Sequence, residues 1–373
     1  MIYLDSAATS LQKPRSVPQA VAHAMQTMSS PGRGAYPAAM LASDTVYSCR
    51  EALAELLDVP EPENIVFTMN ATHALNIAIH SLVRPGDRVV VSGYEHNAVM
   101  RPLYLRGARV IVAQSPLFSP DAAVEAFRQA LPGAQAAVCT HVSNVFGYVL
   151  PIGRISALCR KFDVPLIVDA SQSAGVLPVR FSGLGAAFLA MPGHKGLLGP
   201  QGTGVLVCAE PGEPLLAGGT GSLSEQEQMP EWLPDRHEAG THNTAGIAGL
   251  LEGVRYLNRR GVEQVATQER RLLRQLISQL EGTPGLELFV SPDAQLQTGV
   301  LSVRAAGKDC ERVAQALGEA GVAVRAGLHC APLAHRSAHT LETGTVRLSV
   351  SPFNRAGEMD TAAACLKEIL KKL

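Results

Sequence analysis

One lysine of this chain stands in a setting that favours reaction over simple solvation. Lys195 lies in the stretch Met191-Pro192-Gly193-His194-Lys195-Gly196, directly after an apolar run at residues 186–190 that predicts a buried strand. Of the seven lysines, it alone has this setting. Glycines let other groups approach closely, and desolvation makes a neutral amine accessible. A lysine that forms a Schiff base with pyridoxal phosphate needs both. The alternative is a lysine that closes a tight turn and points into water.

An acidic residue ends another predicted strand, 26 positions before this lysine. Asp169 closes the apolar run at residues 165–169. An unpaired buried carboxylate is costly. A pyridinium nitrogen is a suitable partner, because the carboxylate keeps it protonated and the ring then acts as an electron sink. The pair Asp169 and Lys195 therefore indicates a pyridoxal-phosphate site.

Polar residues follow several other predicted strands. Ala71 and Thr72 open a predicted helix, where free backbone N–H groups and the Thr72 hydroxyl would suit a phosphate, although an ordinary helix start is the alternative. His96 follows the next strand and could stack on an aromatic ring or exchange protons, which a lone loop histidine usually does not. Asn144 and Gln172 follow two further strands. Ligands of open α/β sheets bind beyond the carboxyl ends of the strands, so we expect these residues to gather at one edge.

Cys330 differs from the other cysteines. It lies between His329 and Ala331-Pro332 on a predicted loop, whereas most of the other six lie in apolar runs typical of inert core residues. A free thiol has a pKa of about 8.5, so a neighbouring base or positive charge would help to form the thiolate. His329 and Arg325 are near in sequence. Seven scattered cysteines without a C-x-x-C pair argue against a disulfide framework and a zinc site, and indicate a reducing, cytoplasmic location without a bound metal.

The elements that position these residues alternate along the chain. Strands are predicted at 64–68, 88–92, 109–113, 136–140, 165–169, 186–190 and 204–208, with helices at 17–28, 42–57, 71–82, 120–131 and 152–162, another after residue 97, and a loop at 30–36. Continuous apolar strands between helices predict a parallel sheet covered on both faces.

After about residue 282 the pattern restarts as a smaller α/β unit. A long loop at 212–240 and helices at 244–257 and 262–280 precede it. Strands are predicted at 299–303, 322–325 and 345–349, and helices at 309–320 and 356–370. We therefore expect a domain division in the region 255–285.

The composition excludes several classes of protein. A net charge of −1 gives no reason to expect nucleic acid or an anionic membrane as a partner. No stretch has the apolar length of a membrane span, and the first residues, Met1 to Asp5, lack the regions of a signal peptide.

The chain resembles class V members of the fold-type I aminotransferase superfamily, in the branch of cysteine desulfurases and selenocysteine lyases. The matching segments run in the family's order from end to end: Tyr3-Leu4-Asp5-Ser6-Ala7-Ala8-Thr9, Ala71-Thr72-His73-Ala74-Leu75-Asn76, Glu95-His96-Asn97-Ala98, residues 141–147, residues 168–173, Gly193-His194-Lys195, Glu238-Ala239-Gly240-Thr241, residues 325–331 and Val346-Arg347-Leu348-Ser349. The resemblance implies an α/β fold of type I, with a large domain built on a mainly parallel seven-stranded sheet flanked by helices. A smaller C-terminal α/β domain would complete it.

With the resemblance, we expect residues 1–15 to form an arm packed on the small domain. Residues 16–255 would form the large domain that binds pyridoxal 5′-phosphate, and residues 256–373 the small domain that carries the Cys330 loop.

The resemblance also implies a role for each matching residue. Lys195 would bind the cofactor covalently, Asp169 would pair with the pyridinium nitrogen, and His96 would stack on the ring. The remaining cofactor contacts would come from Gln172 and Asn144 at the ring, from Ala71, Thr72 and His194 at the phosphate, and from Thr241 at the phosphate of a neighbouring subunit, which implies a homodimer. Arg347 would bind the substrate carboxylate near Asn144, a task that suits the guanidinium fork, although a surface ion pair is the commoner fate of a lone arginine.

The implied reaction converts L-cysteine to L-alanine and leaves sulfur as a persulfide on Cys330, with iron–sulfur cluster assembly among the possible destinations of the sulfur. Two alternatives remain: a selenocysteine lyase or another class V pyridoxal enzyme, and a non-catalytic scaffold or sulfur-carrier partner. The segment from Cys330 to Arg347 spans 17 positions. So compact a loop favours a dedicated sulfur-acceptor protein. Pro192, Ala71 and His73 depart from residues common in the family, and Pro192 removes one expected phosphate contact.

Overall fold

The larger of two structural units is built on a seven-stranded sheet. The structure is a computed structural model that describes residues 1–32 and 34–373; Arg33, in the loop predicted at residues 30–36, lies outside the described residues. The strands follow the order β2 (Ile65–Thr68), β8 (Gly204–Cys208), β7 (Phe188–Pro192), β6 (Leu166–Asp169), β5 (Ala136–Thr140), β3 (Arg88–Ser92) and β4 (Arg109–Ala113). Only β8 runs against the others, since it pairs antiparallel with both β2 and β7. The prediction of a mainly parallel α/β sheet is confirmed.

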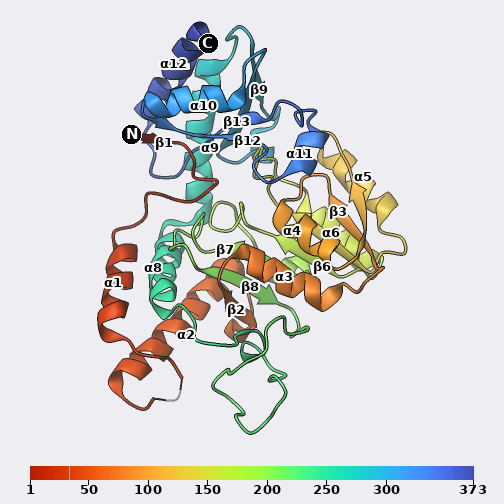
Figure 1. The fold of residues 1–373 in the computed structure, drawn as a ribbon, viewed down its shortest axis with the longest axis vertical. Helices are drawn as coiled ribbons and strands as arrows, with labels where there is room; N and C mark the ends of the chain where they lie inside the picture. The colour runs from red at the N-terminus through yellow and green to blue at the C-terminus, as the bar shows by residue number, and fades with distance from the viewer. Residues whose placement is uncertain (33) are drawn as a thin grey trace.

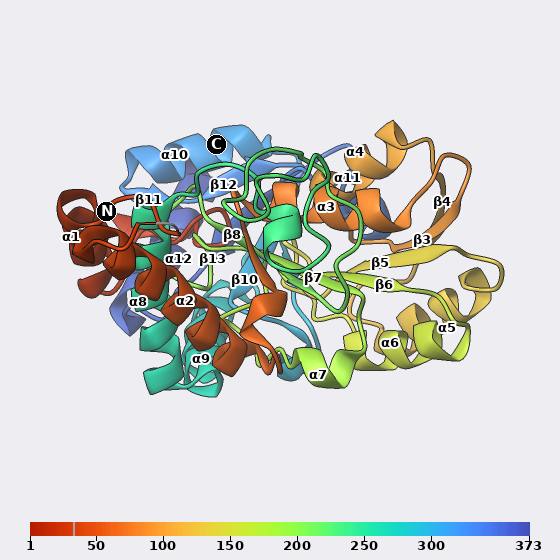
Figure 2. The same ribbon diagram turned by 90° about the horizontal axis from the view of Figure 1, so that it is seen from below.

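Helices cover both faces of this sheet, as its continuous apolar strands require. Figure 2 shows α3 and α4 on one face and α5, α6 and α7 on the other. Their bounds are α3 (Ala71–Leu82), α4 (Asn97–Leu105), α5 (Pro120–Ala130), α6 (Ile152–Lys161) and α7 (Phe181–Leu184). Two hydrophobic cores result, one on each face.

Three further helices flank the β2 end of the sheet: α1 (Ser16–Thr27), α2 (Pro37–Leu57) and α8 (Thr244–Arg260), with α8 packed on both others. Helix α2 begins five residues before the predicted start at Ala42. Pro37 occupies its first turn, where a proline loses no hydrogen bond. The stretch from residue 209 to 243 is irregular apart from a 3-10 turn at Asp235–His237, which matches the loop predicted at 212–240.

The smaller unit has an antiparallel sheet in the order β12 (Arg325–Gly327), β13 (Thr345–Ser349), β10 (Val300–Ala305) and β9 (Leu286–Phe289). Its helices are α9 (Val262–Leu280), α10 (Cys310–Glu319) and α12 (Ala356–Lys372), with α11 (Pro332–Ser337) between β12 and β13. In Figure 1 this unit lies at the top, and α9 rises into it from the end of α8. Strand β9 was not predicted. The single strand predicted at 322–325 is wrong in detail, because it divides into β11 (Val322–Ala323) and β12, which belong to different sheets.

The N-terminal segment connects the two units. Strand β1 (Ile2–Tyr3) pairs parallel with β11, and Asp5 forms a bridge with Ser349 at the end of β13. The chain then crosses to the larger unit, where α1 begins. The predicted domain limits remain a proposal, and the limit after residue 255 falls inside α8. We propose Gly261, between α8 and α9, as the division. Over residues 1–32 and 34–373, no helix is both long enough and apolar enough to cross a membrane.

Candidate active site

The carboxyl ends of the parallel strands surround a cavity. Asp169 is the last residue of β6, and Pro192 is the last residue of β7, three positions before Lys195. The lining includes seven of the nine predicted cofactor residues: Ala71, Thr72, His96, Asn144, Asp169, Gln172 and Lys195. The topology thus brings together side chains that are far apart in sequence, as the strand-end argument predicts.

Lys195 stands on a tight turn that only glycines allow. Gly175, with a φ of +78°, faces Gly196 so closely that an added Cβ would lie 2.3 Å from the Gly196 carbonyl oxygen. The turn is closed by a hydrogen bond from Gly199 N to Gly193 O at 2.7 Å. Desolvation lowers the pKa of Lys195 to about 8, although the negative charge of Asp169 acts in the opposite direction. About a tenth of the amine is therefore neutral and nucleophilic at pH 7, far more than for an ordinary lysine.

Asp169 is buried in the floor of the cavity. One of its oxygens accepts a hydrogen bond from Ser171 N at 2.8 Å. His96 caps α4, because its Nδ1 accepts from Ala98 N at 3.0 Å. Burial lowers the pKa of His96, so its imidazole is neutral at physiological pH. A carboxylate and a neutral ring in one cavity suit a flat, cationic heteroaromatic partner.

The start of α3 forms another wall of the cavity. Asn70 caps this helix through its Oδ1, which accepts from His73 N at 2.9 Å. Ala71 and Thr72 are the first two residues of the helix, so their N–H groups have no acceptor within it. Such a helix start attracts an anion, and the Thr72 hydroxyl adds a donor.

Cys330 is exposed, on a loop tethered at two points beside the cavity. Its carbonyl oxygen accepts from Asn97 N at 2.8 Å, and the carbonyl of His329 accepts from Asn144 Nδ2 at 2.8 Å. Both His329 (φ 50°) and Cys330 (φ 55°) have left-handed backbone conformations. Asn144 also lines the cavity, so the loop is fixed to its rim.

A buried histidine pair supports this loop from below. The rings of His329 and His335 are stacked with their centres 5.8 Å apart. His329 Nε2 lies 3.2 Å from Thr345 Oγ1, and His335 Nδ1 lies 2.7 Å from Thr340 Oγ1. Burial lowers the pKa of His329 to about 2 and of His335 to about 4, so both are neutral. His329 is thus a structural support in this arrangement, and its pKa is far too low for a base at neutral pH.

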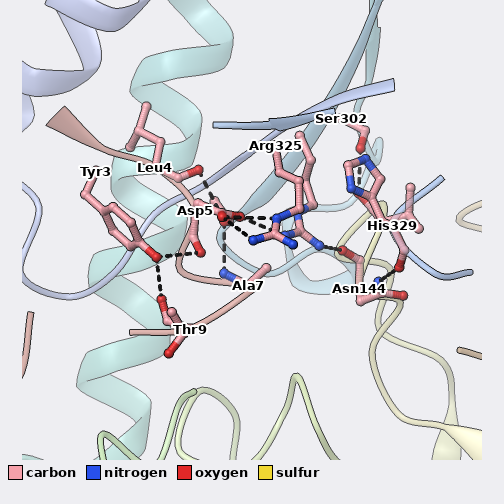
Figure 3. Close-up of polar contacts among 12 residues, drawn as sticks. Tyr3, Leu4, Asp5, Ala7, Thr9, Asn144, Ser302, Arg325 and His329 are labelled. Atoms are coloured by element: carbon pink, nitrogen blue, oxygen red, sulfur yellow. Dashed lines mark hydrogen bonds and ion pairs between the residues drawn. The ribbon is translucent and has the colours of Figure 1, made fainter. Parts of the chain in front are cut away.

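Arg347 is buried in β13 near the same loop, and Figure 3 shows Asp5 and Asn144, the two residues with which it forms hydrogen bonds. Its Nη1 donates to Asn144 O and its Nη2 to Asp5 Oδ1, each at 2.9 Å. Its Nε has no partner among the described residues. A buried donor without an acceptor costs free energy, so this fork suits a bound anion.

Two of the predicted cofactor residues lie outside the cavity lining. His194 turns to the N-terminal arm, with its Nδ1 3.0 Å from Thr9 Oγ1, and burial lowers its pKa to about 4. Thr241 is exposed on the segment before α8. Its predicted partner is a phosphate in a neighbouring subunit, so a single chain does not bring it into this cavity.

Two further residues of the site were not predicted. Glu95 is fully buried, and its Oε1 accepts from Ser92 Oγ and from Thr140 N, which fixes the loop before His96 to β5. Desolvation raises its pKa to about 8. Asp5 pairs with Arg347 and Arg325. Both acids lie in segments that carry the family resemblance, the one signal that singles them out.

The model of the family Aminotransferase class-V matches residues 2–361. The chain belongs to this family. A probable cysteine desulfurase from Methanothermobacter thermautotrophicus is 34% identical over 383 residues, covering 99% of this chain and 94% of the relative. A cysteine desulfurase from Escherichia coli is 31% identical, with 100% and 94% covered. The chain spans 55% of the length of another relative, a probable cysteine desulfurase from Mycolicibacterium paratuberculosis that is 33% identical and covers 99% of this chain.

Solved structures agree with this family. The apo structure of the cysteine desulfurase from Thermococcus onnurineus NA1 matches with a TM-score of 0.91 at 29% identity, covering 100% of this chain and 95% of the other. Enzymes of the class V family use pyridoxal 5′-phosphate. The cavity fits that group: it presents an amine of low pKa, a buried carboxylate, a neutral imidazole and an open helix start.

Proposed function

We propose that this protein is a pyridoxal-phosphate-dependent cysteine desulfurase that converts L-cysteine to L-alanine and keeps the sulfur as a persulfide on Cys330. One observation carries the proposal: an exposed thiol is tethered to the rim of the cavity that holds Lys195 and Asp169. Simple transamination needs no such thiol.

Each residue of the cavity has a task in this reaction. Lys195 binds the cofactor and, with its lowered pKa, exchanges a proton with the substrate's α-carbon. Asp169 would pair with the cofactor's ring nitrogen, His96 would stack on the ring, and the start of α3 at Thr72 would hold the phosphate. When bound, pyridoxal phosphate supplies an electron sink that weakens bonds at the substrate's α- and β-carbons.

Arg347 determines how the substrate lies in the site. Its unpartnered Nε–H is the donor left for the substrate carboxylate. The carboxylate's position at Arg347, beside Asn144, fixes the amino acid between the cavity and the Cys330 loop. The side-chain sulfur is thereby directed toward the loop.

Sulfur transfer is balanced by two bond changes. The Cys330 thiolate attacks the sulfur of the substrate, so an S–S bond forms as the Cβ–S bond breaks. The electron pair of the broken bond stays with Cβ, which takes up a proton and becomes the methyl group of alanine. The Cys330 sulfur and the transferred sulfur are each oxidised by one electron, and Cβ is reduced by two, so no external redox partner is needed for this half of the reaction.

The persulfide then needs an acceptor. Because the loop is held at both His329 and Cys330, we propose that a sulfur-acceptor protein comes to the exposed thiol. Iron–sulfur cluster assembly is one destination of this sulfur. Free cysteines without disulfides fit a reducing compartment, and we place the enzyme in the cytoplasm.

We further propose a homodimer in which Thr241 of each subunit contacts the phosphate bound by the other. Exposed apolar side chains support this, since Met40 on α2 is 55% exposed and Met69, directly before the cavity-lining helix α3, is 58% exposed. A molar mass of a single chain, measured by light scattering, would contradict the proposed dimer.

Release of sulfide and alanine from L-cysteine tests the main proposal. Wild type and Cys330→Ala are compared in the presence of a reductant, after both are checked for the cofactor's visible absorption. We expect wild type to form both products, and the variant to keep the absorption but lose sulfide. Cys310→Ala is the matched control, because this half-buried thiol lies on α10, and it should react as wild type.

The other outcomes separate the alternatives. Equal turnover by wild type and Cys330→Ala would exclude Cys330 as the nucleophile. Absorption without any reaction on cysteine, together with a reaction on selenocysteine, would indicate a selenocysteine lyase. Absence of the absorption band from purified protein would support a non-catalytic scaffold.

A further inference from the structure

Two arginines of the smaller unit face each other beside the active site. Arg325 on β12 and Arg347 on β13 are directly opposite residues of an antiparallel pair. Like charges in this position destabilise a sheet. Arg347 has 3% of its side chain exposed, whereas Arg325 has 55% exposed. The buried charge of Arg347 therefore needs a partner from elsewhere in the chain.

That partner comes from the N-terminal arm. Asp5 Oδ1 accepts from Arg347 Nη2 at 2.9 Å, and Asp5 Oδ2 lies 3.1 Å from both Nε and Nη2 of Arg325. Figure 3 shows the Asp5 carboxylate beside the guanidinium group of Arg325. One carboxylate thus bridges two cations that are 22 positions apart in sequence, and each of its oxygens has its own arginine.

The arm holds this carboxylate in place through several backbone contacts. Ser349 N donates to Leu4 O at 2.7 Å, and Ala7 N donates to Ser349 Oγ at 2.9 Å. Tyr3 Oη donates to Thr9 O at 2.8 Å, which closes the turn around Asp5. Strand β13 therefore carries both Arg347 and the anchor for the arm that supplies its counter-ion.

The same arm also reaches the cofactor cavity. Gln172 Nε2 donates to Ala7 O at 2.9 Å, and Ser10 N donates to His194 O at 2.9 Å. From Asp5 to Ser10, the arm contacts two arginines of the smaller unit and, in the larger unit, Gln172 and His194. It thus fixes the distance between the two parts of the active site.

We propose that Asp5 is a positioning residue that holds the Arg347 fork for the substrate carboxylate, so that the N-terminal arm is part of the substrate site. The inference rests on the proposed function of Arg347 and adds to it. Asp5 accepts a hydrogen bond from Nη2 of Arg347, and the Asn144 carbonyl accepts one from Nη1. Both terminal nitrogens of the guanidinium group are therefore fixed, while its Nε–H stays free for a ligand.

The bridge also sets the charge of the substrate site. Two guanidinium groups and one carboxylate leave a single positive charge, which matches one substrate carboxylate. Without Asp5 the two arginines repel each other. The fork then loses its orientation, although the site becomes more positive. We infer that orientation outweighs the added charge, since Arg325 is largely exposed and its charge is screened.

The experiment measures binding of L-alanine to the cofactor-loaded enzyme by calorimetry, alongside steady-state kinetics with L-cysteine. Asp5→Asn keeps the size of the side chain and removes its charge. We expect L-alanine to bind on the order of tenfold more weakly, and KM to rise by a larger factor than kcat falls. Asp5→Glu should recover part of the affinity. Glu287→Gln is the matched control, because Glu287 pairs with Arg304 at 2.6 Å on the same sheet but away from the site. This variant should bind L-alanine as tightly as wild type.

Two results would overturn the inference. Wild-type affinity in Asp5→Asn would mean that Arg347 needs no help from the arm. Equal losses of affinity, kcat and melting temperature in Asp5→Asn and Asp5→Glu would show that the residue serves only the fold. A wild-type enzyme that binds L-alanine but releases no sulfide from L-cysteine would count against the proposed desulfurase reaction, while the role of Asp5 in carboxylate binding would still be tested.

Discussion

Gly253 in α8 packs directly against the carbonyl oxygen of Leu197, two residues after Lys195. A Cβ at Gly253 would lie 2.4 Å from that oxygen, 3.0 Å from the Leu198 carbonyl carbon and 3.2 Å from Gly199 N. All three neighbours are backbone atoms, so they cannot rotate away. The packing of α8 therefore fixes the position of the turn that carries Lys195.

Gly253→Ala should push this turn away from α8. We expect a loss of unfolding free energy of about 1–3 kcal/mol, typical of overpacking. Because the turn carries Lys195, the fraction of purified protein with the cofactor's visible absorption should also fall. Absorption spectra and thermal melting in the same preparation check both effects.

Gly318→Ala provides the control for that change. Gly318 also lies within a helix, α10, but an added Cβ there meets no atom within 4 Å among the described residues. This substitution should leave cofactor content unchanged and stability equal or slightly higher. Equal cofactor loss in both variants would show that the contact with Leu197 does not matter.

Arg347→Lys tests whether substrate binding needs only the positive charge of this side chain or also the forked geometry of its guanidinium group. Lysine keeps a positive charge but cannot bond Asp5, Asn144 and a substrate carboxylate in one plane. We expect KM for L-cysteine to rise about ten- to a hundredfold, because a charge-assisted hydrogen bond is worth about 1.5–3 kcal/mol. Initial rates over a range of cysteine concentrations give the value.

Arg304→Lys is the companion variant, since Arg304 pairs with Glu287 on the same small sheet. Its KM should match that of wild type. If Arg347→Lys behaved in the same way, substrate binding would have to depend on another cation.

The principal cavity residues could be found from sequence because each lies at the end of an apolar strand or within a few residues after it. Lys195 and Asp169 show this most clearly, since β6 and β7 are neighbours and their ends deliver both side chains to one place. The alternation of strands and helices also predicted the mainly parallel sheet. The alternation could not predict that β8 runs in the opposite direction, because an apolar run has the same sequence pattern in a parallel and in an antiparallel strand.

The role of Asp5 could not be derived from the local sequence. It is 342 positions from Arg347, and neither residue's neighbours in sequence indicate the other. Glu95 was missed for a different reason: a loop glutamate normally faces water, and only the packing of β5 against β3 encloses it. Strand β9 was missed because Leu286–Phe289 is short and only partly buried.

Thr345→Val should loosen the support of the Cys330 loop. The Thr345 hydroxyl lies 3.2 Å from His329 Nε2 and donates to Ser302 Oγ at 3.2 Å, and the residue is fully buried. Valine has the same shape but leaves the His329 nitrogen without a partner, at a cost of about 1–3 kcal/mol. We expect Cys330 to react at a changed rate with iodoacetamide, measured by mass spectrometry, and sulfide release to fall.

Thr298→Val tests whether this effect is specific. Thr298 is also buried, and its hydroxyl donates to Gly147 O at 3.4 Å, away from the Cys330 loop. The rate at which Cys330 is alkylated in this variant should stay at the wild-type value. An unchanged rate in Thr345→Val would mean that the tethers at Asn97 and Asn144 are enough to hold the loop.

Glu269 predicts a pH dependence of stability that is independent of the catalytic residues. It is buried on α9, in the wall of a second cavity lined by residues of both units. Desolvation raises its pKa to about 8 from an ordinary value of 4.5, although Arg270 opposes the shift. Between these two pH values the folded protein keeps the proton that the unfolded chain releases. This group therefore makes stability fall as pH rises from 4.5 to 8.

Glu269→Gln removes the titrating group and keeps its shape. Relative to wild type, the variant should gain about 1 kcal/mol or less at pH 5 and on the order of 4 kcal/mol at pH 8. Denaturant unfolding at both pH values measures the difference. Glu263→Gln is the control, because Glu263 is exposed on the same helix and its substitution should have the same small effect at both pH values. A gain from Glu269→Gln that is identical at pH 5 and pH 8 would show that Glu269 is ionised in the folded protein throughout this range, with a partner that offsets its burial.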